Sequence, residues 1–123
     1  MRDLSEIIIE DGITEINENT IENHRNITSV KIPDSVLVIA DKAFANCINL
    51  KEIKLPAGIM HIGKAAFSNC ISLESIEIPD GIKSIEESCF EGCESLESIS
   101  LPDSVTVIKD KAFAACTGIK NLI

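Results

Sequence analysis

Apolar and polar positions follow a pattern that returns every 23 residues along most of the chain. Each period opens with a segment in which apolar and polar residues alternate, and this segment ends at a proline. The alternation predicts a short strand with one buried side, because successive side chains of a strand point to opposite faces. In the period 50–72 the residues expected to point inward are Leu50, Ile53, Leu55, Ile59, Ile62, Ala66, Phe67 and Cys70.

Three residue types share this period. Prolines occur at Pro33, Pro56, Pro79 and Pro102, phenylalanines at Phe44, Phe67, Phe90 and Phe113, and cysteines at Cys47, Cys70, Cys93 and Cys116. A period of about 20–29 residues that carries a short apolar strand is typical of a leucine-rich solenoid. A unit this short cannot bury its own apolar side, so we expect equivalent residues of successive units to stack in columns.

Each unit is expected to contain two short strands and a short helix. Proline lacks the N–H group that a sheet needs, and so it ends the first strand. The second strand carries an apolar pair such as Ile59 and Ile62. Ala43, Phe44 and Cys47 fall at i, i+1 and i+4, which predicts about one and a half turns of α or 3-10 helix. The residue before the cysteine favours a left-handed conformation in three units but not in the fourth, at Asn46, Asn69, Gly92 and Ala115.

The length of 123 residues and the continuous period predict a single repeat domain that spans 1–123. A degenerate N-terminal repeat occupies 4–26, and its loss of consensus is expected of a cap with a neighbour on one side only. Regular repeats follow at 27–49, 50–72, 73–95 and 96–118, and residues 119–123 start a truncated sixth.

The consensus Leu-x-x-Ile-x-Leu-Pro-x-Ser/Gly-Val/Ile-x-x-Ile-x-x-x-Ala-Phe-x-x-Cys closely resembles the BspA-like leucine-rich repeat family. The resemblance covers nearly the whole chain. It implies an α/β repeat solenoid, a right-handed leucine-rich repeat superhelix with short parallel strands and short α or 3-10 turns. It also implies a non-enzymatic protein–protein interaction module without a cofactor. Members of this family are commonly parts of bacterial surface proteins that serve adhesion by binding host proteins or other cells.

Composition narrows the class of partner and the compartment. A net charge of -9 and an aromatic content of 3% disfavour nucleic acid, which needs basic residues and stacking rings. No apolar run approaches the roughly 18 residues that cross a bilayer, so membrane insertion is not expected. The start of the chain does not resemble a signal peptide. We therefore expect a cytoplasmic protein if the chain is complete, and a cell-surface or secreted one if it is a trimmed piece.

The residues that could carry chemistry form no recognisable catalytic or metal-binding set. His24 heads the cysteine column, but a straight file of ligands does not converge on a metal, so no metal site is predicted. Disulfides between adjacent repeats are possible by distance, but buried free thiols are the favoured interpretation. His61 is expected to point outward, away from the thiols, so neither catalysis nor cofactor binding is predicted.

The outward positions of the first strand are the predicted partner-binding surface. Its charged residues are Lys31, Lys51, Glu52, Lys54, Glu74, Glu77 and Glu97. The alternative is ordinary surface ion pairing between repeats, as between Lys51 and Glu74 or between Lys54 and Glu77. The outward side of the second strand is unexpectedly apolar at Met60 and Val107, which is either scattered exposure or part of an interface.

The carboxyl end of the sequence lacks the polar residues that normally cap a solenoid. The apolar residues there are Ile119, Leu122 and Ile123. They suggest either a segment of a longer repeat array or self-association, with a possible homodimer through this end.

Overall fold

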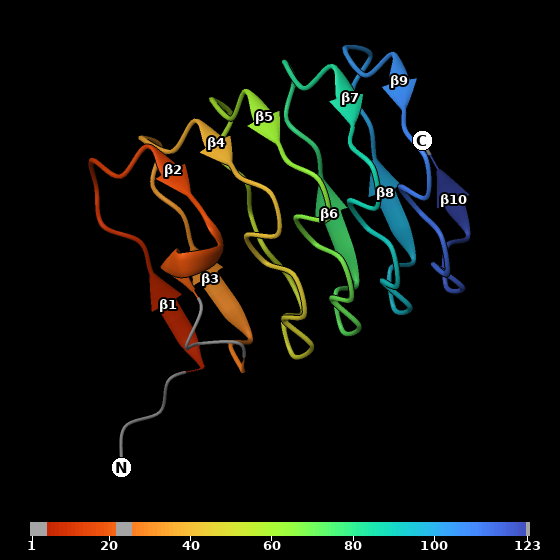
Figure 1. Cartoon of the computed structure of the whole chain (residues 1–123), viewed down its shortest axis with the longest axis horizontal. Coiled ribbons are helices and arrows are strands. Elements are labelled where there is room, and N and C mark those ends of the chain that lie inside the picture. Colours follow the sequence, from red (N-terminus) through yellow and green to blue (C-terminus); the bar gives the residue numbers. More distant parts are fainter. Residues whose placement is uncertain (1–4, 22–25, 123) are drawn as a thin grey trace.

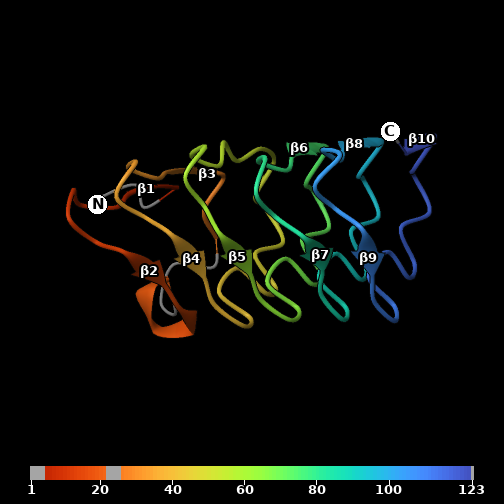
Figure 2. The ribbon, with the colours of Figure 1, turned by 90° about the horizontal axis from the view of Figure 1, so that it is seen from above.

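The computed structural model describes residues 5–21 and 26–122. For residues 121–122 only the backbone is described. The chain winds as a stack of flattened coils, and successive coils follow the sequence from one end of the molecule to the other (Figure 1). The first strands of the coils line one side of the stack and the second strands line another (Figure 2). The fold is therefore a parallel β-solenoid.

The first strands form two parallel sheets, and paired strands within a sheet are one repeat apart. They are β1 (Glu6–Ile8), β3 (Ser29–Lys31), β6 (Ser75–Glu77), β8 (Ser98–Ser100) and β10 (Asn121–Leu122). Ile7 lies opposite Val30 in the pair β1–β3, and Ile76 lies opposite Ile99 in the pair β6–β8. This register places apolar residues of successive coils on the same inward side.

The second strands are shorter and also form two parallel sheets, with the break between the third and the fourth strand of this stack. They are β2 (Glu15–Ile16), β4 (Val38–Ile39), β5 (His61–Ile62), β7 (Ser84–Ile85) and β9 (Val107–Ile108). Ile16 pairs with Ile39, which pairs with Ile62, so one isoleucine per coil continues the core. The predicted strands are therefore present in both stacks, except for the first strand of the period 50–72.

Between the two stacks of strands, phenylalanine rings form one continuous column. The rings of Phe44, Phe67, Phe90 and Phe113 stack with centroid separations of 5.3, 5.4 and 5.6 Å and are tilted by only 6°, 5° and 4°. The first three rings are fully buried. These separations match the spacing of adjacent coils, which confirms the expectation that equivalent residues stack.

The helix expected before each cysteine is absent from the described repeats, so the α/β class was wrong in its helical part. The segments 41–46, 64–69, 87–92 and 110–115 are successions of turns, and the described residues hold a single 3-10 helix, η1 (Glu18–Thr20). The reason is that successive N–H groups donate alternately to their own turn and to the next coil. Ala45 N–H donates to Lys42 C=O of its own turn at 3.1 Å, whereas Phe44 N–H donates to Ala66 C=O of the next coil at 2.8 Å. Bonds to the next coil replace the ladder that an α-helix requires. The right-handed sense of the superhelix stays a prediction from the resemblance.

The turns place two residues per coil in the left-handed region. One column was expected at Asn46, Asn69 and Gly92, which have φ of 65°, 60° and 80°. Ala115, which was not expected to join them, has a φ of 59°. The second column was not foreseen, and it is formed by Lys42, Ala65, Ser88 and Lys111. These side chains have no shared preference for positive φ, so their conformation comes from the bonds between coils rather than from local sequence.

Candidate interaction surface

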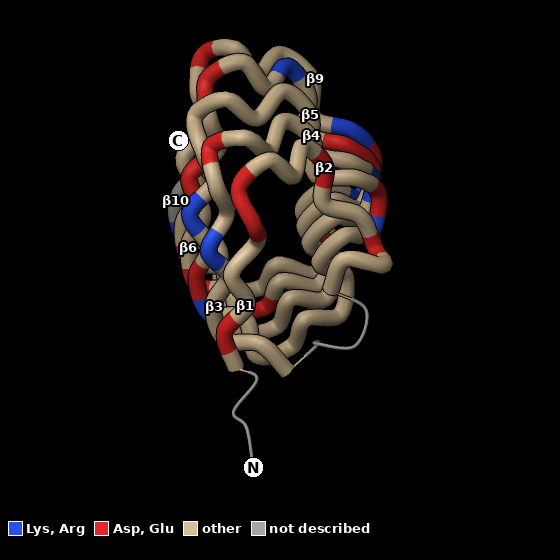
Figure 3. Tube along the Cα trace, turned by 90° about the vertical axis from the view of Figure 1, so that its left-hand side faces the viewer, with Lys and Arg blue, Asp and Glu red and all other residues tan. Residues whose placement is uncertain are grey.

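The outward side of β1, β3, β6, β8, β10 and the segment 50–55, here called the first-strand face, carries all the predicted partner-binding residues. Lys31, Lys51, Glu52, Lys54, Glu74, Glu77 and Glu97 are exposed. Viewed along the stack, acidic and basic residues lie on the outside of the coils, and both signs occur along the edge formed by β1, β3 and β6 (Figure 3). The alternation of the strands produces this arrangement, because their other side is committed to the core.

The charged residues of this face are mostly not paired with one another. Within the described ranges, ion pairs join Lys109 to Glu86 at 2.9 Å and Lys120 to Glu97 at 3.9 Å. The expected pairs from Lys51 to Glu74 and from Lys54 to Glu77 are not formed. Long exposed side chains gain little from such contacts and lose rotamer freedom, which explains their absence. Their charges are consequently available to a partner.

The sheet of the first-strand face is interrupted at its third coil. The segment 50–55 forms no strand there, and it pairs with β6 only through a bridge between Glu52 and Ser75. Ile9 N–H donates to Lys31 C=O at 3.0 Å, and Ile78 N–H donates to Ser100 C=O at 3.1 Å. In the described part of the chain, the equivalent amides of the intervening coils, Ile32 and Leu55, make no such bond.

Like charges disfavour regular pairing on the β3 side of the interruption, whereas Lys54 and Glu77 on its β6 side have opposite charges. Regular pairing of β3 with the segment 50–55 would set Lys31 directly opposite Lys54, since the two residues are one repeat apart. Like charges opposite each other destabilise a parallel or antiparallel pair, and the neighbouring strands avoid this with serine at Ser75, Ser98 and Ser100. The sequence pattern indicated these lysines as binding residues, but it did not indicate that the sheet is interrupted beside them.

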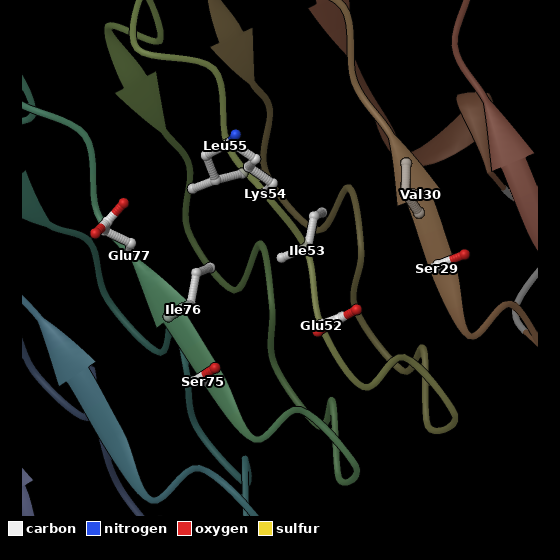
Figure 4. A pocket seen from close by; sticks show the side chains of 9 residues that line it. All are labelled: Ser29, Val30, Glu52, Ile53, Lys54, Leu55, Ser75, Ile76 and Glu77. Carbon is white, nitrogen blue, oxygen red and sulfur yellow. The ribbon is translucent and has the colours of Figure 1, made fainter.

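A hollow of about 500 Å³ lies over the interruption. Figure 4 shows its lining on three successive coils, with Ser29 and Val30 on one side, Glu52, Ile53, Lys54 and Leu55 in the middle, and Ser75, Ile76 and Glu77 on the other. A second hollow of about 530 Å³ adjoins it, because Lys54, Leu55 and Glu77 line both. Three of the predicted binding residues, Glu52, Lys54 and Glu77, therefore meet at one concavity.

Burial makes the cysteine thiols weak nucleophiles and weak metal ligands. Cys70, Cys89, Cys93 and Cys116 are free thiols, and Cys70 and Cys93 donate to the carbonyl groups of Phe44 and Phe67 at 3.2 and 3.1 Å. Burial raises the pKa of the Cys93 thiol to about 12, and the nearby Cys116 makes a smaller contribution in the same direction. Such a thiol is protonated at neutral pH and is a poor nucleophile and metal ligand. This agrees with the favoured interpretation of the column as core.

No metal site or membrane span accompanies these thiols. Within 5–21 and 26–122 no group of three or more His, Cys, Asp and Glu residues is placed to hold a metal ion. His24 lies outside the described residues, and His61 is exposed on β5. Within the same ranges no helix has the length and apolarity needed to cross a bilayer.

A buried carboxylate on the opposite side of the stack escaped sequence inspection. Glu86 is 7% exposed, accepts a hydrogen bond from Ser84 and forms the ion pair with Lys109. These two contacts, the serine first, lower the pKa of Glu86 below its ordinary value. The only signal was the spacing, because Glu86 and Lys109 are opposite charges one repeat apart. The ion pair of Glu86 with Lys109 therefore links two neighbouring coils of the same chain.

At the last described coil the core is uncovered. Val107 and Ile108 are 47% and 48% exposed, whereas Ile62 and Ile85, in the column of Ile108, are 2% and 1% exposed. Ile119 is partly buried against the core. The side chains of Leu122 and Ile123, which were predicted to take part in self-association, lie outside the described residues.

Solved structures share this architecture. A leucine-rich repeat protein of T. pallidum is 29% identical with a TM-score of 0.85, over 92% of this chain and 53% of that one. A leucine-rich repeat protein of Bacteroides ovatus is 34% identical with a TM-score of 0.87, over 94% of this chain and 30% of that one. This chain thus spans about half, or less, of the length of these two proteins. A leucine-rich cell-surface protein of Faecalibacterium prausnitzii, 24% identical with a TM-score of 0.67 over 96% of this chain and 47% of that one, shares the fold.

A comparison with curated proteins finds no match. The model of the BspA-type leucine-rich repeat region, with six copies, matches residues 14–123. Since this match includes most of the chain and the repeats form the solenoid described above, the chain belongs to the BspA-type leucine-rich repeat family.

Proposed function

We propose that this chain is a non-enzymatic interaction module that binds a partner protein through the first-strand face. The family and its structural neighbours are typically scaffolds for protein binding rather than catalysts. The observation that carries the proposal is the set of exposed charges around the interrupted sheet, of which Lys51, Lys54, Glu74 and Glu77 form no ion pair with described residues. Stacked repeats commonly use such a continuous surface for recognition.

The biological form of this binding is proposed from the family resemblance. The BspA-like family implies adhesion, so the partner would be a host protein or a protein of another cell. A surface of mixed charge suits such a role, because complementary charges select partners and speed their encounter.

Charge reversal tests the proposal. A variant with Lys51→Glu, Lys54→Glu, Glu74→Lys and Glu77→Lys keeps the net charge and alters only exposed positions. The matched control carries Lys42→Glu, Lys64→Glu, Glu87→Lys and Asp110→Lys, which are also exposed but belong to the turns between the strand stacks. Circular dichroism and urea unfolding should show that both variants keep the fold.

The readout is binding to a partner first captured with the unchanged chain and then purified. The variant on the first-strand face should lose this partner, and the control should keep it. Equal affinity of all three proteins would show that another surface binds.

Self-association is a second candidate, because Ile108 is half exposed where its column is buried in other coils, and the neighbouring Val107 is half exposed as well. Apolar residues gathered at one end favour contact with a second copy. Light scattering over a concentration series should show dimers that the double variant Val107→Ser and Ile108→Ser abolishes. A monomer at the highest concentration would reject this candidate.

A further inference from the structure

The two adjoining hollows form a single groove on the first-strand face. They share Lys54, Leu55 and Glu77, and together they follow the segment 52–57 between β3 and the strands that succeed it. Six residues in extended conformation span roughly 20 Å at about 3.3 Å per residue. The groove therefore has the length of a short extended segment rather than the round shape that suits a small molecule.

The groove offers main-chain groups as well as side chains. Leu55 lines both hollows, and its N–H has no acceptor in the described part of the chain, although the corresponding amide of Ile78 is bonded. Leu55 is 9% exposed, and a polar backbone group at such a site gains from a hydrogen-bonding partner. A bound peptide in extended conformation supplies carbonyl acceptors, as in the binding of a strand to an open sheet.

The charge of the groove selects its occupant. Four carboxylates, Asp34, Glu52, Glu77 and Asp80, line the two hollows, and Lys54 is the one basic residue in their lining. These groups are exposed, and none of them forms an ion pair with described residues. A mainly negative lining attracts lysine and arginine and repels acidic segments and phosphate.

The floor of the groove is apolar. Val30, Ile53 and Ile76 are 8%, 7% and 4% exposed, so a small part of each reaches the hollow. A valine-sized side chain suits this floor, whereas the carboxylates lie around it. Since side chains of an extended peptide alternate between two sides, basic and small apolar residues in alternation match the groove.

We propose that the groove binds an extended basic segment of a partner protein, in which lysine or arginine alternates with small apolar residues. This inference rests on the proposed function of the first-strand face and specifies the kind of partner. The basic side chains pair with Glu52, Glu77 and Asp80, and a peptide carbonyl group accepts a hydrogen bond from Leu55 N–H.

Nuclear magnetic resonance titration of the full chain tests the inference with three capped heptapeptides. The first alternates lysine and valine, the second has glutamate in place of lysine, and the third repeats the first with N-methylated valines. The first should shift the amide signals of 29–32, 52–57 and 75–80 and slow the hydrogen exchange of Leu55. The second should bind at least about tenfold more weakly. Shifts spread over other faces, or equal binding of the acidic peptide, would overturn the inference.

The peptide with N-methyl groups separates pairing through the backbone from attraction by charge. N-methylation leaves the peptide carbonyl groups in place, but its methyl groups keep the peptide main chain away from Leu55 N–H. This peptide should therefore bind several-fold more weakly than the first despite its equal charge. If the two basic peptides bind equally well, only charge attracts them and the extended mode of binding is wrong.

Variants of the groove provide the second arm. Glu52→Gln, Glu77→Gln and Asp80→Asn together should weaken binding of the basic peptide by about tenfold or more. The matched control, Glu87→Gln, Glu94→Gln and Asp110→Asn, removes the same charge from exposed positions outside the groove and should bind as before. An equal loss in both would show non-specific attraction and contradict the inference.

The experiments distinguish failure of the groove inference from failure of the proposed function. If no basic peptide binds but the captured partner still depends on the charges of the first-strand face, the face is functional and the groove inference is wrong. If the captured partner is indifferent to those charges, the proposed function itself fails, whatever the peptides do.

Discussion

The side chain of Asn69 occupies the place where a side chain of Gly92 would begin. The two residues are one repeat apart, and a Cβ atom at Gly92 would overlap Asn69 Oδ1. Asn69 also donates to Asn46 Oδ1 of the preceding coil at 3.1 Å. Gly92 has a φ of 80°, so it meets both the conformational and the steric demand of its site. This asparagine ladder therefore ends at a glycine whose missing side chain leaves room for Asn69.

Gly92→Ala should destabilise the fold by about 2–4 kcal/mol, because it adds a steric overlap to the cost of positive φ. Gly81→Ala is the control, since Gly81 has a φ of 102° but no atom within 4 Å of an added Cβ. It should lose only about 1–2 kcal/mol. Urea unfolding measures both. The double variant Asn69→Gly and Gly92→Ala should recover part of the loss, and a simple sum of the two effects would disprove the overlap.

Ala115→Gly should stabilise the protein by roughly 0.5–1 kcal/mol. Ala115 is exposed and has a φ of 59°, where a Cβ atom is strained and glycine is not. Ala57→Gly is the matched control, because Ala57 is also exposed but is not in the left-handed region. The control should lose up to about 1 kcal/mol through the greater freedom of the unfolded chain. Thermal unfolding gives both differences, and a loss at both positions would argue against the strain at Ala115.

Phe67→Ala should cost about 3–5 kcal/mol. The ring of Phe67 is fully buried and stacks on two others, at 5.3 and 5.4 Å. Phe113→Ala should cost less, because Phe113 is only partly buried and stacks on Phe90 alone. Chemical denaturation of the two variants tests this order. Equal losses of stability in the two variants would mean that ring contacts between neighbouring coils contribute little to stability.

Glu86→Gln should destabilise the protein at neutral pH and much less in acid. The bonds from Ser84 and Lys109 lower the pKa of Glu86 in the folded state, so the folded chain binds this proton less readily than the unfolded chain does. The contribution of Glu86 is therefore present above its ordinary pKa of 4.5 and is lost as pH falls through the folded value. Unfolding of the unchanged chain and of the variant from neutral to acid pH measures the difference, which should shrink on acidification. A constant difference would contradict the role of the carboxylate charge.

The native thiols should resist alkylation at neutral pH, with Cys116 reacting first. Burial raises the pKa values of the Cys70, Cys89, Cys93 and Cys116 thiols, and Cys116 is the only one of the four that is not buried. Alkylation with iodoacetamide followed by mass spectrometry gives the order of reaction, and the urea-unfolded chain serves as the fully reactive control. Rapid labelling of Cys70 in the folded chain would contradict the buried column.

The period of 23 residues determined much of the fold by itself. Equivalent residues can bury their apolar sides only against one another, so the spacing of Phe44 and Phe67 was enough to predict a stacked column. The same alternation that turned Ile53 and Ile76 inward turned Lys54 and Glu77 outward, which is why the exposed face was found correctly. These features depend on local periodicity and on the number of residues per coil.

Contacts between coils decided the rest. The sequence around Phe44 was compatible with a helix, but its N–H group bonds to Ala66 of the next coil, and the segment became a series of turns. The sheet likewise lacks regular pairing between β3 and the segment 50–55, where Lys31 and Lys54 would lie opposite each other. The ion pair of Glu86 with Lys109 depends on burial. A hydrogen bond or a charge repulsion between coils has no trace in the pattern of a single repeat. Its energy depends on a neighbour that only the folded stack brings within reach.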